Sequence, residues 1–316
     1  MRFIGIGDLH LSSSNGHGGF SRFVESSDSY IVSEVRNVLE KNEDSGIENI
    51  LLYGDICDST RMSYKAHAEL VKLFDEFQDL RFHIILGNHD KFAVSGLGDS
   101  LDLLRLFNLK NVTIYDSPQT VNFGDCKLRF LSYPFADFKK NELNVCHLDL
   151  NGGLTDSGRK IENKIEPSKF NIVSGHIHTS GKVKNAYYSG TLYQLTFGES
   201  LDGKGYHIIE CSGSDFEVSQ IPWTPKFKLK TCTVDQLEKD QNTFYKVVSE
   251  NPIDPSLYND YNIVQCKISS NPTLTDDLDI KFENLNLSCD AVFKKLVKKY
   301  DSSKAITELR ARLLAR

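Results

Sequence analysis

The sequence predicts an α/β fold in which helices cover one or two sheets. Up to about residue 220, short apolar runs alternate with amphipathic stretches, which is the order that builds sheets flanked by helices. The chain has 316 residues, of which 40% are hydrophobic and 25% charged, so it can bury a large core. The later half is richer in predicted strands and in hairpin-like turns, such as Asp202-Gly203-Lys204-Gly205. We therefore expect a mixed sheet, or two stacked sheets flanked by helices.

The predicted elements follow from the apolar pattern. Amphipathic spacing predicts helices over 25–42, 63–79 and 98–107; in the first, Ile31, Val35, Val38 and Leu39 recur on one helical face. Short apolar runs predict strands over 2–7, 49–54, 82–86, 111–115, 127–132, 143–147, 170–174, 186–197 and 205–211. No apolar stretch approaches the ~18 residues of a membrane span.

Pro222-Trp223-Thr224-Pro225 interrupts this pattern, and we place a domain boundary there. We predict one domain over 1–222, a smaller region over 223–288 with one strand at 262–268, and C-terminal helices within 289–316, at 290–300 and 303–315. The last two carry apolar stripes that suit either a groove on another protein or packing on their own domain.

Charge and cysteine content restrict the class of protein. The net charge of −6 argues against a protein that binds nucleic acid through bulk basic charge. The seven cysteines are widely spaced and form no C-x-x-C motif, so we expect reduced core residues in an intracellular, cytoplasmic protein. We assign His83 and His207 to strands and His67 to a helix surface.

Five short segments place metal-ligand residue types at predicted strand ends. Ligands in α/β proteins bind beyond the carboxyl ends of strands, so these segments can converge on one point. Mixed oxygen and nitrogen donors favour Mn, Fe, Zn or Mg over a thiolate site, and one carboxylate, Asp55, can bridge two ions. The segments are Gly7-Asp8-Leu9-His10, Gly54-Asp55-Ile56-Cys57-Asp58, Gly87-Asn88-His89-Asp90, His147 after Leu143–Cys146, and Gly175-His176-Ile177-His178.

This ordered set resembles the calcineurin-like metallophosphoesterases. The resemblance implies a four-layer α/β/β/α sandwich with a small C-terminal α+β capping region. It implies one metal ion held by Asp8, His10, Asp55 and His178, and a second held by Asp55, Asn88, His147 and His176. His89 would act on the leaving group or the transition-state charge. Asp58 is either an auxiliary residue of the site or a loop cap.

A second resemblance narrows the activity. Ser189-Gly190, Phe197-Gly198-Glu199 and Lys204-Gly205-Tyr206 resemble a run in SbcD-type nucleases, and His147–Gly152 resembles a segment of the recombination nuclease subunit of T-even phages. This implies a DNA exonuclease and endonuclease in recombination, repair and replication, dependent on two Mn²⁺ or Mg²⁺ ions. It also implies a homodimer and an SbcC-like coiled-coil ATPase partner, in the host cytoplasm if phage-encoded. The alternatives are a small-substrate phosphodiesterase, a protein phosphatase of the same superfamily, or an inactive binding scaffold.

Overall fold

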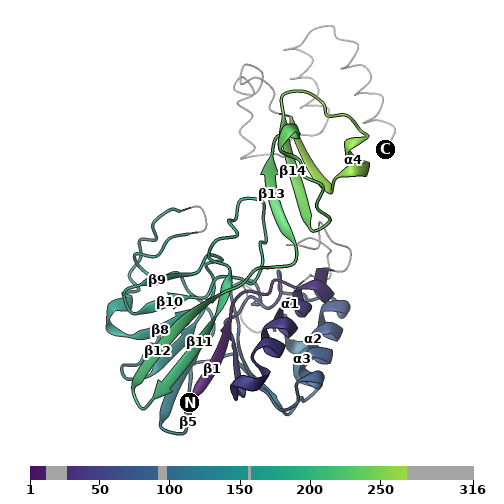
Figure 1. The fold of residues 1–316 in the computed structure, drawn as a ribbon. Helices are drawn as coiled ribbons and strands as arrows, with labels where there is room; N and C mark the ends of the chain where they lie inside the picture. The colour runs from purple at the N-terminus through teal and green to yellow at the C-terminus, as the bar shows by residue number, and fades with distance from the viewer. Residues whose placement is uncertain (12–26, 92–97, 156–157, 269–316) are drawn as a thin grey trace, which may run out of the picture. The chain divides into compact units, whose positions relative to one another are not determined.

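The computed structural model describes residues 1–11, 27–91, 98–155 and 158–268 (Figure 1). The predicted helices at 290–300 and 303–315 lie outside these residues, as does the whole 289–316 segment. The chain divides into two compact units, Met1–Lys267 and Ile268–Arg316. The three-part division expected from the sequence stays a prediction.

Two six-stranded mixed sheets form most of the described structure. The first has the order β12-β11-β1-β2-β3-β4, in which β1 to β4 run parallel, and comprises β1 Arg2–Ile6, β2 Asn49–Leu52, β3 Arg81–Ile85, β4 Val112–Tyr115, β11 Gly205–Ser212 and β12 Asp215–Pro222. The second has the order β5-β6-β7-β8-β10-β9 and comprises β5 Gln119–Phe123, β6 Cys126–Leu131, β7 Leu143–Cys146, β8 Asn171–Ser174, β9 Gly181–Val183 and β10 Ala186–Tyr188. In both sheets the central strands are parallel.

Alternating side chains of the first sheet bind it to two layers at once. In β2, Ile50 and Leu52 pack with the helix layer, whereas Leu51 packs with β6 and β7 of the second sheet. Period-two alternation makes this possible because neighbouring strand residues point to opposite faces. The helices of the outer layer are α1 Ser27–Lys41, α2 Tyr64–Glu76 and α3 Asp102–Leu106 (Figure 1). The predicted α/β sandwich is therefore confirmed.

An irregular segment rather than an α-helix covers the outer face of the second sheet in the described residues. Leu148, Leu150 and Ile161 pack on Cys146 and Ile172 there, and the regular structure in this segment is the 3-10 turn η3 Pro167–Lys169. The sequence Asn151-Gly152-Gly153 explains this difference, since these residues favour turns and Gly152 has a φ of +90°. The layer is present, but it is built from loops.

Several predicted elements need correction. The run at 186–197 is a strand only over β10, and β5, β9 and β12 were not predicted. Beyond residue 222, one predicted strand becomes a three-stranded sheet of order β13-β14-β15, accompanied by short helical turns. The remaining elements are η2 Glu43–Ser45, β13 Lys228–Cys232, η4 Val234–Gln236, β14 Thr243–Ser249, α4 Leu257–Asp260 and β15 Ile263–Ile268. No helix among the described residues is long and apolar enough to cross a membrane.

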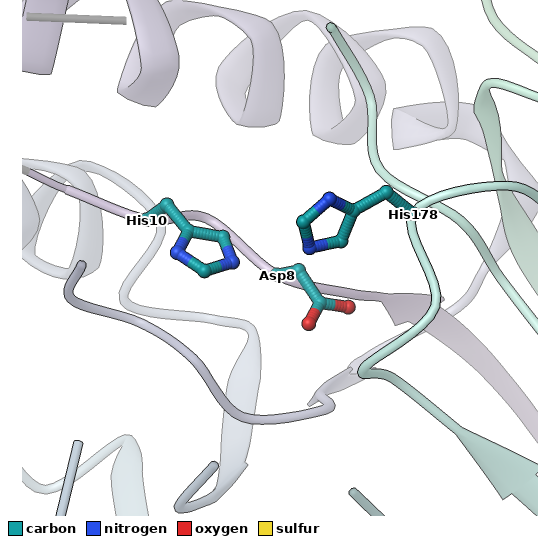
Figure 2. A group of neighbouring side chains, drawn as sticks. All are labelled: Asp8, His10 and His178. Carbon is teal, nitrogen blue, oxygen red and sulfur yellow. The ribbon is translucent and has the colours of Figure 1, made fainter. Parts of the chain in front are cut away.

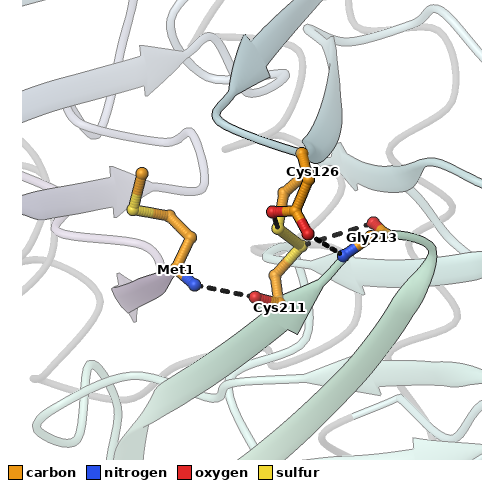
Figure 3. Close-up of a disulfide and its surroundings, with 5 residues drawn as sticks. Met1, Cys126, Cys211 and Gly213 are labelled. Atoms are coloured by element: carbon orange, nitrogen blue, oxygen red, sulfur yellow. Dashed lines mark hydrogen bonds between the residues drawn. A yellow bond between two sulfur atoms is a disulfide. The ribbon is translucent and has the colours of Figure 1, made fainter.

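A disulfide joins the two sheets, contrary to the expectation that every cysteine is reduced. Cys126 of β6 and Cys211 of β11 are bonded, and the N-terminal amine of Met1 donates to the Cys211 carbonyl at 2.7 Å (Figure 3). The two cysteines are 85 residues apart in sequence, and only the folding of one sheet on the other brings them together. Sequence spacing therefore offered no signal for the pair.

We expect the Cys126–Cys211 bond to stabilise the fold. A cross-link closing a loop of this length stabilises a protein by about 4.6 kcal/mol in the chain-entropy description. The guanidinium midpoint of unfolding should be lower for the Cys126→Ala/Cys211→Ala variant than for the parent protein. Dithiothreitol should lower the midpoint of the parent protein by the same amount. Cys232→Ala, at a buried free thiol, is the control for loss of a buried sulfur. A parent midpoint insensitive to dithiothreitol would contradict the prediction.

Two buried histidines predict loss of stability in mild acid. Burial lowers the pKa of His83 and of His207 to about 4, against about 6.5 in an unfolded chain. As the pH falls, the unfolded state therefore takes up protons at these histidines before the folded state does. Their contribution to the unfolding free energy is complete above about pH 6.5 and is lost toward pH 4, by about 3 kcal/mol per histidine. Unfolding curves from pH 7 to 4 should be flatter for His83→Gln/His207→Gln; an equally steep dependence would refute this assignment.

The structure confirms that His83 and His207 lie in strands, but the prediction that His67 lies on a helix surface is wrong. Its side chain is buried on α2, and Nδ1 lies 2.9 Å from the Ser63 carbonyl oxygen. The helix periodicity placed His67 correctly on a helix. It did not show that neighbouring elements cover this face.

Candidate metal centre

Each predicted ligand follows the carboxyl end of a parallel strand. Asp8 and His10 follow β1, and Asp55 follows β2. Asn88 and His89 follow β3, His147 follows β7, and His176 and His178 follow β8. Strands of both sheets thus deliver side chains to the same edge of the sandwich, as the sequence predicted from the order of the motifs.

Backbone strain is concentrated at these residues. Asp8, His10, Asp55 and His176 have φ values of 48°, 46°, 45° and 82°. Residues with a side chain seldom adopt this left-handed region, and strained backbone of this kind gathers at functional sites. Four of the seven candidate ligands share it, so the fold supports an unfavourable backbone in order to aim these side chains.

Two glycines allow the loops to approach one another closely. A Cβ at Gly87 would lie 2.0 Å from Oδ1 of Asp55, and a Cβ at Gly175 would lie 2.8 Å from Oδ2 of Asp8. Any other residue at either position would push a carboxylate out of place. Gly87 and Gly175 therefore provide room for Asp55 and Asp8 respectively.

One group of polar atoms is gathered around His147. Its Nε2 lies 3.0 Å from Oδ1 of Asn88, 3.2 Å from Oδ2 of Asp55 and 3.2 Å from Nδ1 of His176. The His176 Nδ1 in turn lies 3.0 Å from Oδ1 of Asn88. Donor atoms bound at about 2.1 Å around one cation lie about 3 Å apart, so the spacing of this group fits a shared ion.

A second group consists of Asp8, His10 and His178, whose ligand-type atoms all lie within 4.8 Å of one another. Figure 2 shows one nitrogen of each imidazole ring directed toward the Asp8 side chain. The Nε2 atom of His10 is buried and has no hydrogen-bond partner among the described residues. A buried nitrogen without a partner is costly in a fold but suits a cation ligand.

Asp55 lies between the two groups. Its Oδ2 is 3.2 Å from Nε2 of His147 in one group and 3.7 Å from Nε2 of His10 in the other. The backbone N–H of His89 donates to Oδ1 at 2.9 Å and fixes the carboxylate. A carboxylate held in this way has the position required of a bridging ligand. Together the buried His and Asp groups fit a binuclear metal site.

The charges of the two aspartates explain the altered titration of their neighbours. Burial alone would lower the pKa of His147, but Asp55 and Asp8 outweigh it and raise that pKa to about 9. Burial raises the pKa of Asp8, whereas the histidines around Asp55 outweigh its burial and hold its pKa well below the usual range. The two residues are only 1% and 2% exposed, and a divalent cation would neutralise ionised carboxylates buried in this way.

His89 is placed differently from the predicted ligands. Its side chain is 42% exposed, and Nε2 lies 4.0 Å from Oδ2 of Asp55. The Asp58 carbonyl oxygen accepts from its Nδ1 at 2.9 Å, while the Asp58 carboxylate lies 3.2 Å from Nδ1 of His10. Asp58 therefore contacts both histidines, which favours its interpretation as an auxiliary residue over a loop cap.

Asp90 belongs to the site although it was not predicted to have a role there. It is fully buried and accepts from the backbone N–H groups of Ile56, Cys57 and Gly87 and from the Ser100 hydroxyl, at 2.8–3.2 Å. Its carboxylate thus ties the loop after β2 to the loop after β3. An acid directly after His89 in a ligand-rich motif was the available signal.

Comparisons with known proteins agree with this geometry. A model of the calcineurin-like phosphoesterases matches residues 1–195. The chain belongs to this family. It is 26% identical to exonuclease subunit 1 of Enterobacteria phage T4 over 247 residues, which are 71% of this chain and 69% of that protein.

Two bacterial proteins are also similar. The SbcD subunit of the SbcCD nuclease from Staphylococcus saprophyticus is 26% identical over 57% of this chain and 60% of its own length. The protein of the same name from Staphylococcus epidermidis is 22% identical over 65% of this chain and 66% of its own length. The matches span less than two thirds of both bacterial relatives. The structure of a purple acid phosphatase from yellow lupin seeds aligns with this chain at a TM-score of 0.40 and 9% identity. The alignment covers 70% of this chain and 51% of the phosphatase chain.

Proposed function

We propose that this metallophosphoesterase is a DNA exonuclease and endonuclease that uses two metal ions. The observation that carries the proposal is the position of Asp55 between two groups of buried donor atoms. The similarity to a phage exonuclease subunit and to SbcCD nuclease subunits favours DNA over other phosphoesters. We infer roles in recombination, repair and replication from the same relatives.

The residues divide into two ligand sets in this proposal. Asp8, His10, Asp55 and His178 hold one ion, and Asp55, Asn88, His147 and His176 hold the other. Mn²⁺ suits this mixture of imidazole, carboxylate and amide donors, and Mg²⁺ is the alternative. When bound by these residues, two divalent ions would supply the positive charge that holds a phosphoester and makes a water molecule a better nucleophile.

His89 is the catalytic residue that the chain itself contributes. Its exposed ring reaches outward from the centre, where it can donate a proton to the leaving oxygen or stabilise the charge that develops on the phosphate. Asp58 orients the ring through its carbonyl oxygen. The buried aspartates and their backbone donors keep the ligands in place before substrate binds, so little reorganisation is required during reaction.

We further propose a homodimer that acts with a coiled-coil ATPase of the SbcC type. In this arrangement 1–222 is the nuclease domain, 223–288 caps DNA, and 289–316 docks on the ATPase. A DNA substrate would place the protein in the cytoplasm. The net charge of −6 implies that metal ions, local basic positions and this partner supply the affinity for DNA.

Substrate choice tests the proposal. The purified chain should release nucleotides from end-labelled linear duplex DNA in Mn²⁺, and adding the ATPase should increase the rate. Asp8→Ala should abolish release, since it removes one ligand of the centre. Hydrolysis of a nitrophenyl phosphodiester without any hydrolysis of DNA would contradict the nuclease and favour a small-substrate phosphodiesterase.

A further inference from the structure

A buried ion pair lies directly behind His178. Oε1 of Glu199 is 3.3 Å from Nδ1 of His178, and Oε2 of Glu199 is 2.7 Å from Nζ of Lys204. The side chains of Glu199 and Lys204 are 4% and 0% exposed. Removing two charges from water is costly unless their remaining donors and acceptors are paired.

Lys204 is fully paired by three acceptors. Its Nζ donates to Glu199 at 2.7 Å, to the Thr191 hydroxyl at 2.8 Å and to the His178 carbonyl oxygen at 3.0 Å. Glu199 also accepts from the backbone N–H of Leu195 at 3.1 Å. The pair therefore holds His178 twice, by its ring through Glu199 and by its main chain through Lys204.

The contact with Glu199 decides which ring nitrogen carries the proton. A carboxylate only accepts, so Nδ1 of His178 donates, and in the neutral imidazole Nε2 then keeps its lone pair. In Figure 2 one ring nitrogen of His178 points toward Asp8 and the other points away from it. His10 repeats this arrangement, with Nδ1 next to the Asp58 carboxylate and Nε2 without a hydrogen-bond partner in the described part of the chain.

The other group is built differently. The Nδ1 atom of His147 lies 2.7 Å from the backbone carbonyl oxygen of Tyr53.

We propose that Glu199, supported by Lys204, is a positioning residue that fixes the tautomer and orientation of His178 and so serves one ion of the pair. This inference rests on the two-ion centre of the proposed function and assigns Glu199 to the Asp8, His10 and His178 group. Carboxylates behind ligating histidines contribute about 10–100-fold to metal affinity.

Calorimetric titration of the full chain with Mn²⁺ tests the proposal. Parent protein should bind two ions, and Glu199→Gln should weaken one of them about 10–100-fold while leaving the other unchanged. The variant Glu199→Leu/Lys204→Met removes both charges together, so it leaves no unpaired charge in the core and should show the same selective loss. Glu34→Gln is the matched control, because Glu34 is a buried carboxylate that accepts hydrogen bonds from the Trp223 indole N–H and the Lys226 backbone N–H instead.

A second measurement separates positioning from a general structural role. Imidazole ¹H–¹⁵N spectra of the chelator-treated protein should show the Nδ1–H tautomer of His178 in the parent and a mixture in Glu199→Leu/Lys204→Met. Unchanged binding of both ions, equal weakening of both, or fewer than two ions on the parent would each overturn the inference. Two ions on a parent that hydrolyses no DNA would overturn the nuclease proposal and leave this inference standing.

Discussion

Asp55→Asn should abolish phosphodiester hydrolysis, and we expect the largest effect of any single substitution in this chain. The aspartate offers two anionic oxygens, one of which faces both groups of donor atoms at 3.2 and 3.7 Å. An asparagine of the same shape offers one neutral oxygen, which cannot bridge two cations. Loss of one charge-stabilising donor costs about 10²–10³-fold in turnover, so loss of the bridge should cost more than about 10³-fold.

Rates on labelled DNA, together with Mn²⁺ titration, provide the measurement for Asp55→Asn. The variant should bind both ions more weakly, because the Asp55 carboxylate faces both groups of donor atoms. Asp99→Asn is a suitable control, since Asp99 is also mostly buried but pairs with Arg105. A variant that retains full turnover in saturating Mn²⁺ would show that Asp55 does not bridge.

His89→Gln should separate catalysis from metal binding. Because the ring is 42% exposed and 4.0 Å from the nearest Asp55 oxygen, its loss should leave both ions bound and the fold intact. General acid catalysis contributes about 10²–10⁴-fold, and we expect turnover to fall within that range.

The comparison that decides the role of His89 is turnover against affinity. Parent and His89→Gln should give the same two-ion binding curve and very different rates on DNA. His67→Gln is the control, at a buried histidine of α2. If His89→Gln instead loses an ion, then His89 is a ligand and the leaving-group role assigned to it is wrong.

The order of motifs predicted where the site lies, because that inference needs only strand ends. Apolar runs ending in Asp8, Asp55 and Asn88 share one edge whenever their strands are parallel, and β1, β2 and β3 are. Tertiary structure was required for the rest. The Cys126–Cys211 pair and the burial of His67 depend on how separate elements pack, which periodicity along one element does not encode.

The residues behind the site illustrate the same limit. Glu199 and Lys204 are charged, and charged side chains are usually exposed, so composition favours a surface position for both. They are buried because each pairs with the other and because His178, Thr191 and Leu195 supply their remaining hydrogen-bond partners. Short strands such as β9 and β13 were missed for a related reason, since three to five residues carry too little apolar alternation to predict a strand.

Anomalous diffraction from crystals grown with Mn²⁺ tests the two-ion centre most directly. We predict two peaks about 3.5–4 Å apart, one bound by Asp8, His10 and His178 and the other by Asn88, His147 and His176, with Asp55 coordinating both. A single peak, or two peaks without Asp55 between them, would contradict the account.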